Sequence, residues 1–142
     1  MKLVREIVVA QDTVTVDTTT TVTAAARLMS ERHIGAVPVL DGDRVVGIFS
    51  ERDALTRVIG GGLDPATTSI SQVMSSPLIV ADIGDTYEAC LNRMTDEHVR
   101  HLIVLDGERM AGVVSMRDLM EVDLVEKVQT IALLHEYIHY AP

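Results

Sequence analysis

Two serine–aspartate pairs carry the side chains best suited to bind a small polar ligand. They lie in the segments Ser50-Glu51-Arg52-Asp53 and Ser115-Met116-Arg117-Asp118. An ionised carboxylate can accept hydrogen bonds from two adjacent hydroxyl groups, while free backbone N–H groups at a helix start, with a serine hydroxyl, suit a phosphate. The two groups would compete at one spot, so they must serve different ends of a ligand. Ser-x-x-Asp is also a helix-capping motif, and both roles can hold at once.

A second candidate lies in the tail, where His135-Glu136-Tyr137-Ile138-His139 matches the H-E-x-x-H motif of zinc metalloproteases. On a helix this spacing puts both histidines on one face. No third ligand or substrate-binding region follows in the sequence, and a tail helix with apolar positions at Val125, Val128 and Ile131 explains the segment better. We therefore expect no metal site and no catalytic residue. A metal-dependent hydrolase, and an adventitious or interface metal at the two histidines, stay open as alternatives.

Composition excludes several classes of function. The formal net charge of −9 argues against a general nucleic-acid binder, which needs a basic face. No apolar run approaches the ~18 residues of a membrane span, and Arg5, Glu6 and Asp12 interrupt any signal-peptide pattern. Cys90 is the only cysteine, so we expect a buried thiol, no disulfide and a cytoplasmic setting. Neither nucleic acid nor a membrane is an expected partner.

The chain contains an internal repeat. Shifted by 65 residues, the segment 33–53 aligns without a gap on the segment 98–118, and ten of its 21 positions are identical. The matched positions include the Asp-Gly pairs at 41–42 and 106–107 and both Ser-x-x-Asp motifs. Chance does not produce this agreement, so the chain is a duplicated unit.

Both copies predict the same order of elements. A short strand around Val14 and Val16, or over residues 78–80, precedes a helix. Thr20 and Asp85 are the expected N-caps of these helices, and Asp85 would form a capping box with Glu88. Two strands joined by the Asp-Gly turn follow, and a second helix begins after each hairpin. The hairpin strands are expected over 36–40 and 44–50, and over 102–105 and 109–115.

We therefore expect an α/β (α+β) fold with two β-α-β-β-α repeats. Each sheet leaves one face apolar, so the repeats should pack face to face about a pseudo-twofold axis. The expected boundaries are residues 5–60 for the first repeat, 61–69 for a connector, 70–123 for the second repeat and 124–142 for a helical tail.

The motifs resemble those of the CBS domain, named after cystathionine β-synthase. The first copy carries His33-Ile34-Gly35-Ala36-Val37-Pro38-Val39 and Gly47-Ile48-Phe49-Ser50; the second carries Arg100-His101-Leu102-Ile103-Val104 and Gly112-Val113-Val114-Ser115. The family often has proline where Ile103 stands. The resemblance covers roughly residues 5 to 123 and implies a Bateman module, in which two CBS repeats form two clefts that commonly hold AMP, ADP, ATP or S-adenosylmethionine.

The same resemblance implies which residues share a cleft. The first cleft would place Ser50, Arg52 and Asp53 beside Ile79, Val80, Arg100 and His101. The second cleft would place Ser115, Arg117 and Asp118 beside Val14, Thr15, Gly35 and Ala36. In both, the aspartate would hold the ribose. Only the first cleft would gain the basic pair, with a permanent charge on Arg100 and a further charge on His101 when it is protonated.

The resulting hypothesis is a regulatory module that senses an adenosine-type nucleotide, acts as a homodimer, controls an unidentified protein and catalyses nothing. A ligand-independent interaction or dimerisation module is the alternative, and a nucleotide titration distinguishes the two. No resident cofactor is expected, since the regulatory ligand would be AMP, ADP or ATP.

Overall fold

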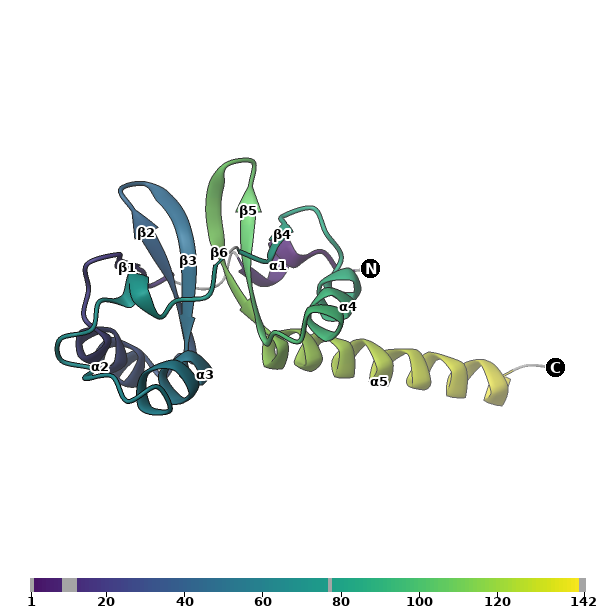
Figure 1. Cartoon of the computed structure of the whole chain (residues 1–142). Coiled ribbons are helices and arrows are strands. Elements are labelled where there is room, and N and C mark those ends of the chain that lie inside the picture. The colour runs from purple at the N-terminus through teal and green to yellow at the C-terminus, as the bar shows by residue number, and fades with distance from the viewer. Residues whose placement is uncertain (1, 9–12, 77, 141–142) are drawn as a thin grey trace.

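The computed structural model describes residues 2–8, 13–76 and 78–140, and it confirms the expected fold of two β-α-β-β-α repeats (Figure 1). In the first repeat, strand β1 (Val16–Asp17) precedes helix α2 (Val22–Arg32), and strands β2 (Ala36–Asp41) and β3 (Arg44–Ser50) form the hairpin. Helix α3 (Glu51–Asp53) then continues into the π-helical turn η1 (Ala54–Ile59). The sheet order is β1-β2-β3, with β1 parallel to β2 and β3 antiparallel to it.

The second repeat follows the same plan with a longer final helix. Strand β4 (Val80–Asp82) and helix α4 (Tyr87–Glu97) precede the hairpin of β5 (His101–Asp106) and β6 (Arg109–Ser115). Helix α5 (Met116–Tyr140) is continuous, so no break separates the final helix of this repeat from the expected tail. Beyond Glu126 the described side chains of α5 are exposed, and the tail does not pack on its own module (Figure 1).

Two N-cap predictions were wrong by one residue. Thr21, not Thr20, caps α2 through its side chain, and Thr86, not Asp85 in a box with Glu88, caps α4. Each threonine hydroxyl accepts a hydrogen bond from the backbone N–H three residues on, at 3.2 and 3.1 Å. Asp85 instead accepts a hydrogen bond from the backbone N–H of Asp82 and forms an ion pair with Arg93.

His33 and His98 end α2 and α4 in the left-handed conformation, with φ of 54° and 55°. In each case the cap N–H donates to carbonyls of the last helical turn. Their recurrence in both repeats therefore reflects a helix stop, which a polar ring tolerates better than a β-branched side chain.

Neither repeat completes its apolar core from its own residues alone. The buried residues form two clusters, one in each repeat. The short segment that comes before the first repeat completes the core of the second, and the short segment that comes before the strands of the second repeat completes the core of the first. Helix α1 (Val4–Val8), which sequence reasoning missed, places Val4 and Val8 in the core of the second repeat. The 3₁₀ turn η2 (Ile70–Gln72) places Ile70 and the following Val73 in the core of the first.

This exchange of short segments binds the repeats together and explains two buried glycines. A Cβ added at Gly112 would lie 2.6 Å from Cγ1 of Val8, and a Cβ added at Gly47 would meet the thioether of Met74. Both glycines therefore make room for the exchanged segment where it crosses the sheet. Cys90 is buried as expected, and burial raises the pKa of its thiol.

Replacing each of the two glycines with alanine should lower the stability of the protein by a different amount. Gly112→Ala should lower the free energy of unfolding by about 1–3 kcal/mol, because Val8 is branched and cannot move aside without leaving the core. Gly47→Ala should cost less, since the flexible Met74 side chain can turn away. Urea unfolding of both variants checks the order, and a larger loss for Gly47→Ala would contradict it.

Candidate functional site

The first Ser-x-x-Asp motif lies at the junction of β3 and α3. Ser50 ends the strand and caps the helix, while Asp53 returns the contact, so both halves of a capping box are present. The Asp53 carboxylate oxygen Oδ2 accepts hydrogen bonds from the Ser50 backbone N–H at 3.0 Å and its hydroxyl at 3.1 Å. Asp53 is only 5% exposed. A buried carboxylate is costly without partners, and these contacts offset that cost.

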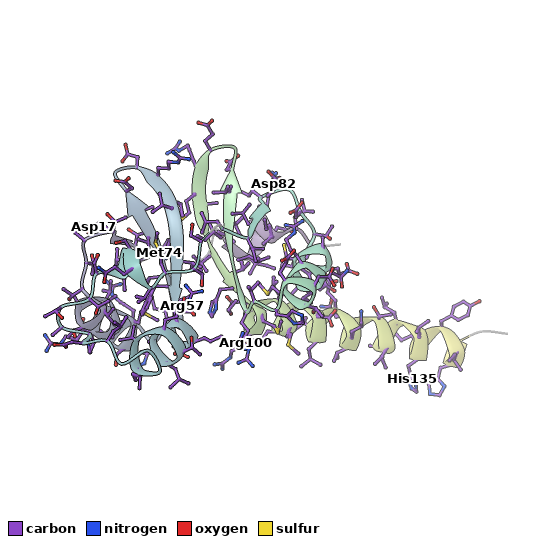
Figure 2. The ribbon with its side chains drawn as sticks, viewed as in Figure 1. Asp17, Arg57, Met74, Asp82, Arg100 and His135 are labelled. Carbon is purple, nitrogen blue, oxygen red and sulfur yellow. The ribbon has the colours of Figure 1, made fainter. Side chains whose placement is uncertain are left out.

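The other oxygen of Asp53 contacts the segment 73–75, which follows η2. Oδ1 accepts a hydrogen bond from the Ser75 hydroxyl at 3.0 Å and lies 3.8 Å from Nε of Arg57. Arg57 also donates to the carbonyls of Val73 and Met74, at 3.3 and 2.7 Å. Figure 2 shows Arg57 and Met74 at the first repeat, close to β3 and η1. The carboxylate therefore holds the segment 73–75 as well as capping the helix.

The second Ser-x-x-Asp motif repeats this local geometry at the start of α5. The Ser115 N–H donates to Oδ2 of Asp118 at 3.1 Å, and the Asp118 N–H donates to Oγ of Ser115 at 3.1 Å. Asp118 is half-buried, whereas Asp53 is almost fully buried. The duplicated motif thus performs its capping role twice, in two different environments.

The helix starts of the two repeats meet around His101. A Cβ placed on Gly35 would lie 3.4 Å from the His101 ring, so this ring packs over the Gly35 backbone. Glu51 and Asp118, from different repeats, both act electrostatically on His101. Arg52 reaches across to the carbonyl of His98, 3.4 Å from its Nη1. Carboxylates and cations from both repeats therefore converge at one junction.

Burial lowers the pKa of His101 below its ordinary value of about 6.5. Glu51 and Asp118 act in the opposite direction, and Arg100 adds to the lowering. The imidazole is therefore neutral near neutral pH, so Arg100 alone supplies the permanent charge of the expected basic pair.

His101 should make folding sensitive to mild acid. Its unfolded form takes up a proton near pH 6.5, whereas its folded form does so only at lower pH, so the stability of the protein falls as pH drops through this window. The melting temperature of the wild type should fall by a few degrees relative to His101→Gln between pH 7.5 and about pH 5. His33→Asn, at an exposed helix stop, should track the wild type. Parallel melting curves for wild type and His101→Gln would contradict the prediction.

The remaining predicted site residues are more dispersed. The Gly35 carbonyl accepts the Glu51 N–H, and Ala36 pairs with Ser50, so both line the start of α3. The Arg100 carbonyl accepts the Met116 N–H while its side chain is exposed at the base of the second repeat (Figure 2). Arg117 is exposed and pairs with Glu121, 3.6 Å away on its own helix.

The predicted strand residues lie farther from the aspartates. Ile79 packs against the second core, and the Val80 carbonyl accepts a hydrogen bond from Arg93. Val14 is half-buried before β1, and Thr15 lines an open hollow of about 650 Å³ whose other walls belong to the first repeat. Asp118 borders a second hollow, of about 400 Å³, formed with the N-terminal segment and α5. Neither hollow joins the two repeats at the His101 junction, so the side-chain contacts define the candidate site better than these hollows do.

Sequence reasoning missed Ser75, Arg57 and Glu51. Ser75 lies just after η2 and meets Asp53 only because the chain returns over β3, where Ser75 and Ile48 form an isolated bridge. Arg57 follows Asp53 by four residues, which is the spacing of a helical ion pair and was the available signal.

The H-E-x-x-H segment lies on the exposed end of α5. The His135 and His139 ring centroids are 4.4 Å apart in an edge-on arrangement. Within the described ranges of the chain, no cluster of three or more His, Cys, Asp or Glu side chains could hold a metal ion. Both histidine side chains are exposed, as are all the described side chains of α5 beyond Glu126.

None of the helices in the described part of the chain is long and apolar enough to cross a membrane. The two repeats, with their exchanged segments and the junction between their helix starts, form one paired module. The chain belongs to the CBS domain family, which it matches over residues 4–60 and 70–125. Pairs of such domains are generally regulatory rather than catalytic.

Known proteins share this architecture. Hypoxic response protein 1 of Mycobacterium tuberculosis is 33% identical over 100 residues, which are 70% of each chain. A CBS-domain protein from Burkholderia ambifaria is 30% identical with a TM-score of 0.83, over 87% of this chain and 95% of that one. The CBS domain pair of MJ0100, solved with 5′-methylthioadenosine and S-adenosyl-L-methionine, shares the fold at 19% identity and a TM-score of 0.79, over 89% and 98% of the two chains.

Proposed function

We propose that this protein is a regulatory module that binds an adenosine-type nucleotide, such as AMP, ADP, ATP or S-adenosylmethionine, where its two repeats meet. The observation that carries the proposal is the almost fully buried Asp53 carboxylate at the start of α3, beside the junction where His98 and His101 of the second repeat approach the first. A ribose diol would use the carboxylate, and a phosphate would use Arg100.

Two further observations support this reading. The MJ0100 pair, which has the same fold, binds adenosine-derived ligands. Both repeats also contribute charged groups to the junction, so a ligand there would contact both at once. A ligand that prefers one relative packing of the repeats would shift their equilibrium toward it, and a partner protein could detect that shift. In this proposal the module works in the cytoplasm and has no catalytic step of its own.

A calorimetric titration of the full chain with AMP, ADP, ATP, NAD and S-adenosylmethionine tests the proposal. At least one adenosine ligand should bind with micromolar or tighter affinity, and inosine monophosphate should bind more weakly. Failure of every adenosine ligand to bind would contradict the proposal and favour a ligand-independent module.

Removing the Ser75 hydroxyl should strengthen nucleotide binding, if the ribose uses Asp53. Ser75 occupies Oδ1 of Asp53 at 3.0 Å, so a diol that needs both carboxylate oxygens must displace it. Ser75→Ala should therefore raise AMP affinity by about 2- to 10-fold, the worth of one net hydrogen bond. Calorimetry checks the change, with the exposed neighbour Ser76→Ala as control. Weaker binding by Ser75→Ala would show that the hydroxyl positions the carboxylate instead of competing for it.

The second candidate function is protein interaction without a ligand, through homodimerisation. It is favoured by apolar side chains that are more than half exposed on the final helices of both repeats, including Leu55, Ile59, Met120 and Leu124. Such faces commonly mark protein contacts. Light scattering that shows a monomer at micromolar concentration would contradict the homodimer.

A further inference from the structure

The outer half of α5 is a helix that no other described part of the chain covers. All side chains from Lys127 to His139 are exposed, and the helix projects beyond the second repeat (Figure 1). Large apolar side chains lie within this range and just before it: Leu124, Val128, Ile131 and Ile138 are between 56% and 73% exposed. An isolated helix in water is marginally stable, so a helix of this composition gains most of its stability from packing against another surface.

The spacing of these residues is that of a two-helix seam. Leu124, Val128, Ile131, His135 and Ile138 follow one another at steps of four, three, four and three residues, which is the a/d pattern of a coiled coil. We name these five residues the tail seam. Four of them are apolar, and His135 is the one polar member.

The tail seam faces away from the module. Helix α5 packs on its own repeat through Met116, Leu119 and Val122, and Asp123 accepts a hydrogen bond from Tyr87 at 3.0 Å. In the same heptad phase these residues occupy the b, c and f positions, opposite a and d. A second helix can therefore approach the tail seam without meeting the first module.

The residues beside the tail seam allow two identical copies to approach. Its flanking e and g positions are Val125, Lys127, Ala132, Leu134 and His139, so none of them is acidic. Glu126 and Glu136 lie on the outer positions, which keeps like charges apart although each chain carries a net charge of −9. In a parallel, in-register pair the twofold axis runs along the helices, so each seam residue lies opposite its own copy and the histidines of both copies come to one place.

His135 and His139 together offer two of the four ligands that a tetrahedral metal ion needs. Their rings lie 4.4 Å apart between centroids, one turn apart on α5. A tetrahedral zinc ion with Zn–N bonds of about 2.0–2.1 Å needs neighbouring nitrogens about 3.3 Å apart, which two rings at this separation can supply. Two imidazoles leave two coordination positions unfilled, and a second copy related by the twofold axis would fill both. Imidazole is a preferred ligand of zinc, and the ion would also compensate for burying His135 among apolar residues.

We propose that two copies of this chain pair in parallel through the tail seam, and that His135 and His139 of both copies hold one zinc ion on the twofold axis. The site is incomplete in one chain, which agrees with the absence of a three-ligand cluster in the described residues. This metal site is separate from the nucleotide junction, so it stands or falls independently of the proposed ligand.

Zinc titration of the full chain, after chelator treatment and dialysis, tests the site. Calorimetry should give one zinc ion per two chains, and His135→Ala/His139→Ala should abolish the binding at micromolar zinc. His33→Asn/His98→Asn removes the same number of imidazoles from exposed helix stops and should leave it unchanged. Circular dichroism should show both double variants folded, because all four side chains are exposed.

Cysteine cross-linking tests the pairing itself. Val128→Cys lies in the tail seam, seven residues and about two turns before His135, whereas Gln129→Cys lies on the outer face. Cys90 is buried and should not interfere. Zinc should accelerate disulfide dimer formation by Val128→Cys and not by Gln129→Cys. One zinc ion per chain, zinc binding that survives in His135→Ala/His139→Ala, or equal cross-linking at both cysteines would overturn the proposal.

Discussion

Replacing Asp53 with asparagine should weaken AMP binding by about 100-fold or more, whereas Asp118→Asn should change it less than about threefold. The amide keeps the shape of the side chain but has no charge, so two charge-assisted hydrogen bonds to the ribose, worth about 1.5–3 kcal/mol each, would be lost or reversed. Asp53 adjoins the cleft expected to carry Arg100, and Asp118 adjoins the cleft expected to carry no permanent positive charge from the opposite repeat. Calorimetry with both variants measures the difference.

A stability control is needed, because Asp53 also holds Ser50 and Ser75. Thermal melts should show both variants folded at the temperature of the titration, and Asp96→Asn, on the exposed face of α4, should behave as wild type. If Asp118→Asn removes the tighter AMP site and Asp53→Asn leaves it intact, the assignment of the clefts is wrong.

Arg100→Ala should weaken AMP binding by about 10-fold while leaving adenosine binding nearly unchanged. The guanidinium is exposed and always charged, so it can turn toward a phosphate, and such a charge-assisted contact is worth about 1.5 kcal/mol or more. His101 adds little charge near neutral pH because burial lowers its pKa. AMP and adenosine differ only in the phosphate. Comparing the ratio of their affinities in wild type and variant therefore measures how much Arg100 contributes to binding the phosphate.

Arg109→Ala provides the matched control for Arg100. It makes the same change in net charge at an exposed position in the hairpin turn, far along β6 from the helix start. A loss of AMP affinity equal to that of Arg100→Ala would indicate a general electrostatic effect. Equal losses of AMP and adenosine in Arg100→Ala would exclude a phosphate contact even with the site in the right place.

Local signals predicted the hairpins well. The bounds of β3 and β6 were correct because an Asp-Gly turn sets the strand register, and both turn glycines have positive φ, near 63°. The N-caps were misplaced by one residue because adjacent polar residues, such as Asp85 and Thr86, compete for the same role. Only the direction in which the chain enters the helix decides between them.

The exchanged segments could not be predicted in the same way. Helix α1 has five residues and η2 has three, too few to display a helical period. Their destinations depend on the relative placement of the two repeats, which no local pattern encodes. The contact between Ser75 and Asp53 follows from that placement, and so does the position of His101 over Gly35. The site residues taken from the family resemblance remain predictions until ligand binding is measured.

Because α5 is uninterrupted, a small change in its orientation at the module produces a larger displacement at its far end. Its 25 residues span about 37 Å at 1.5 Å per residue, and its first turn contains Asp118 while its last contains His139. A tilt of about 5° at the base would displace the far end by about 3 Å over that length. The hydrogen bond from Tyr87 to Asp123 lies close to the base and would act as the fulcrum. A small adjustment between the repeats would therefore reach the tip of the helix as a movement comparable to the diameter of a water molecule.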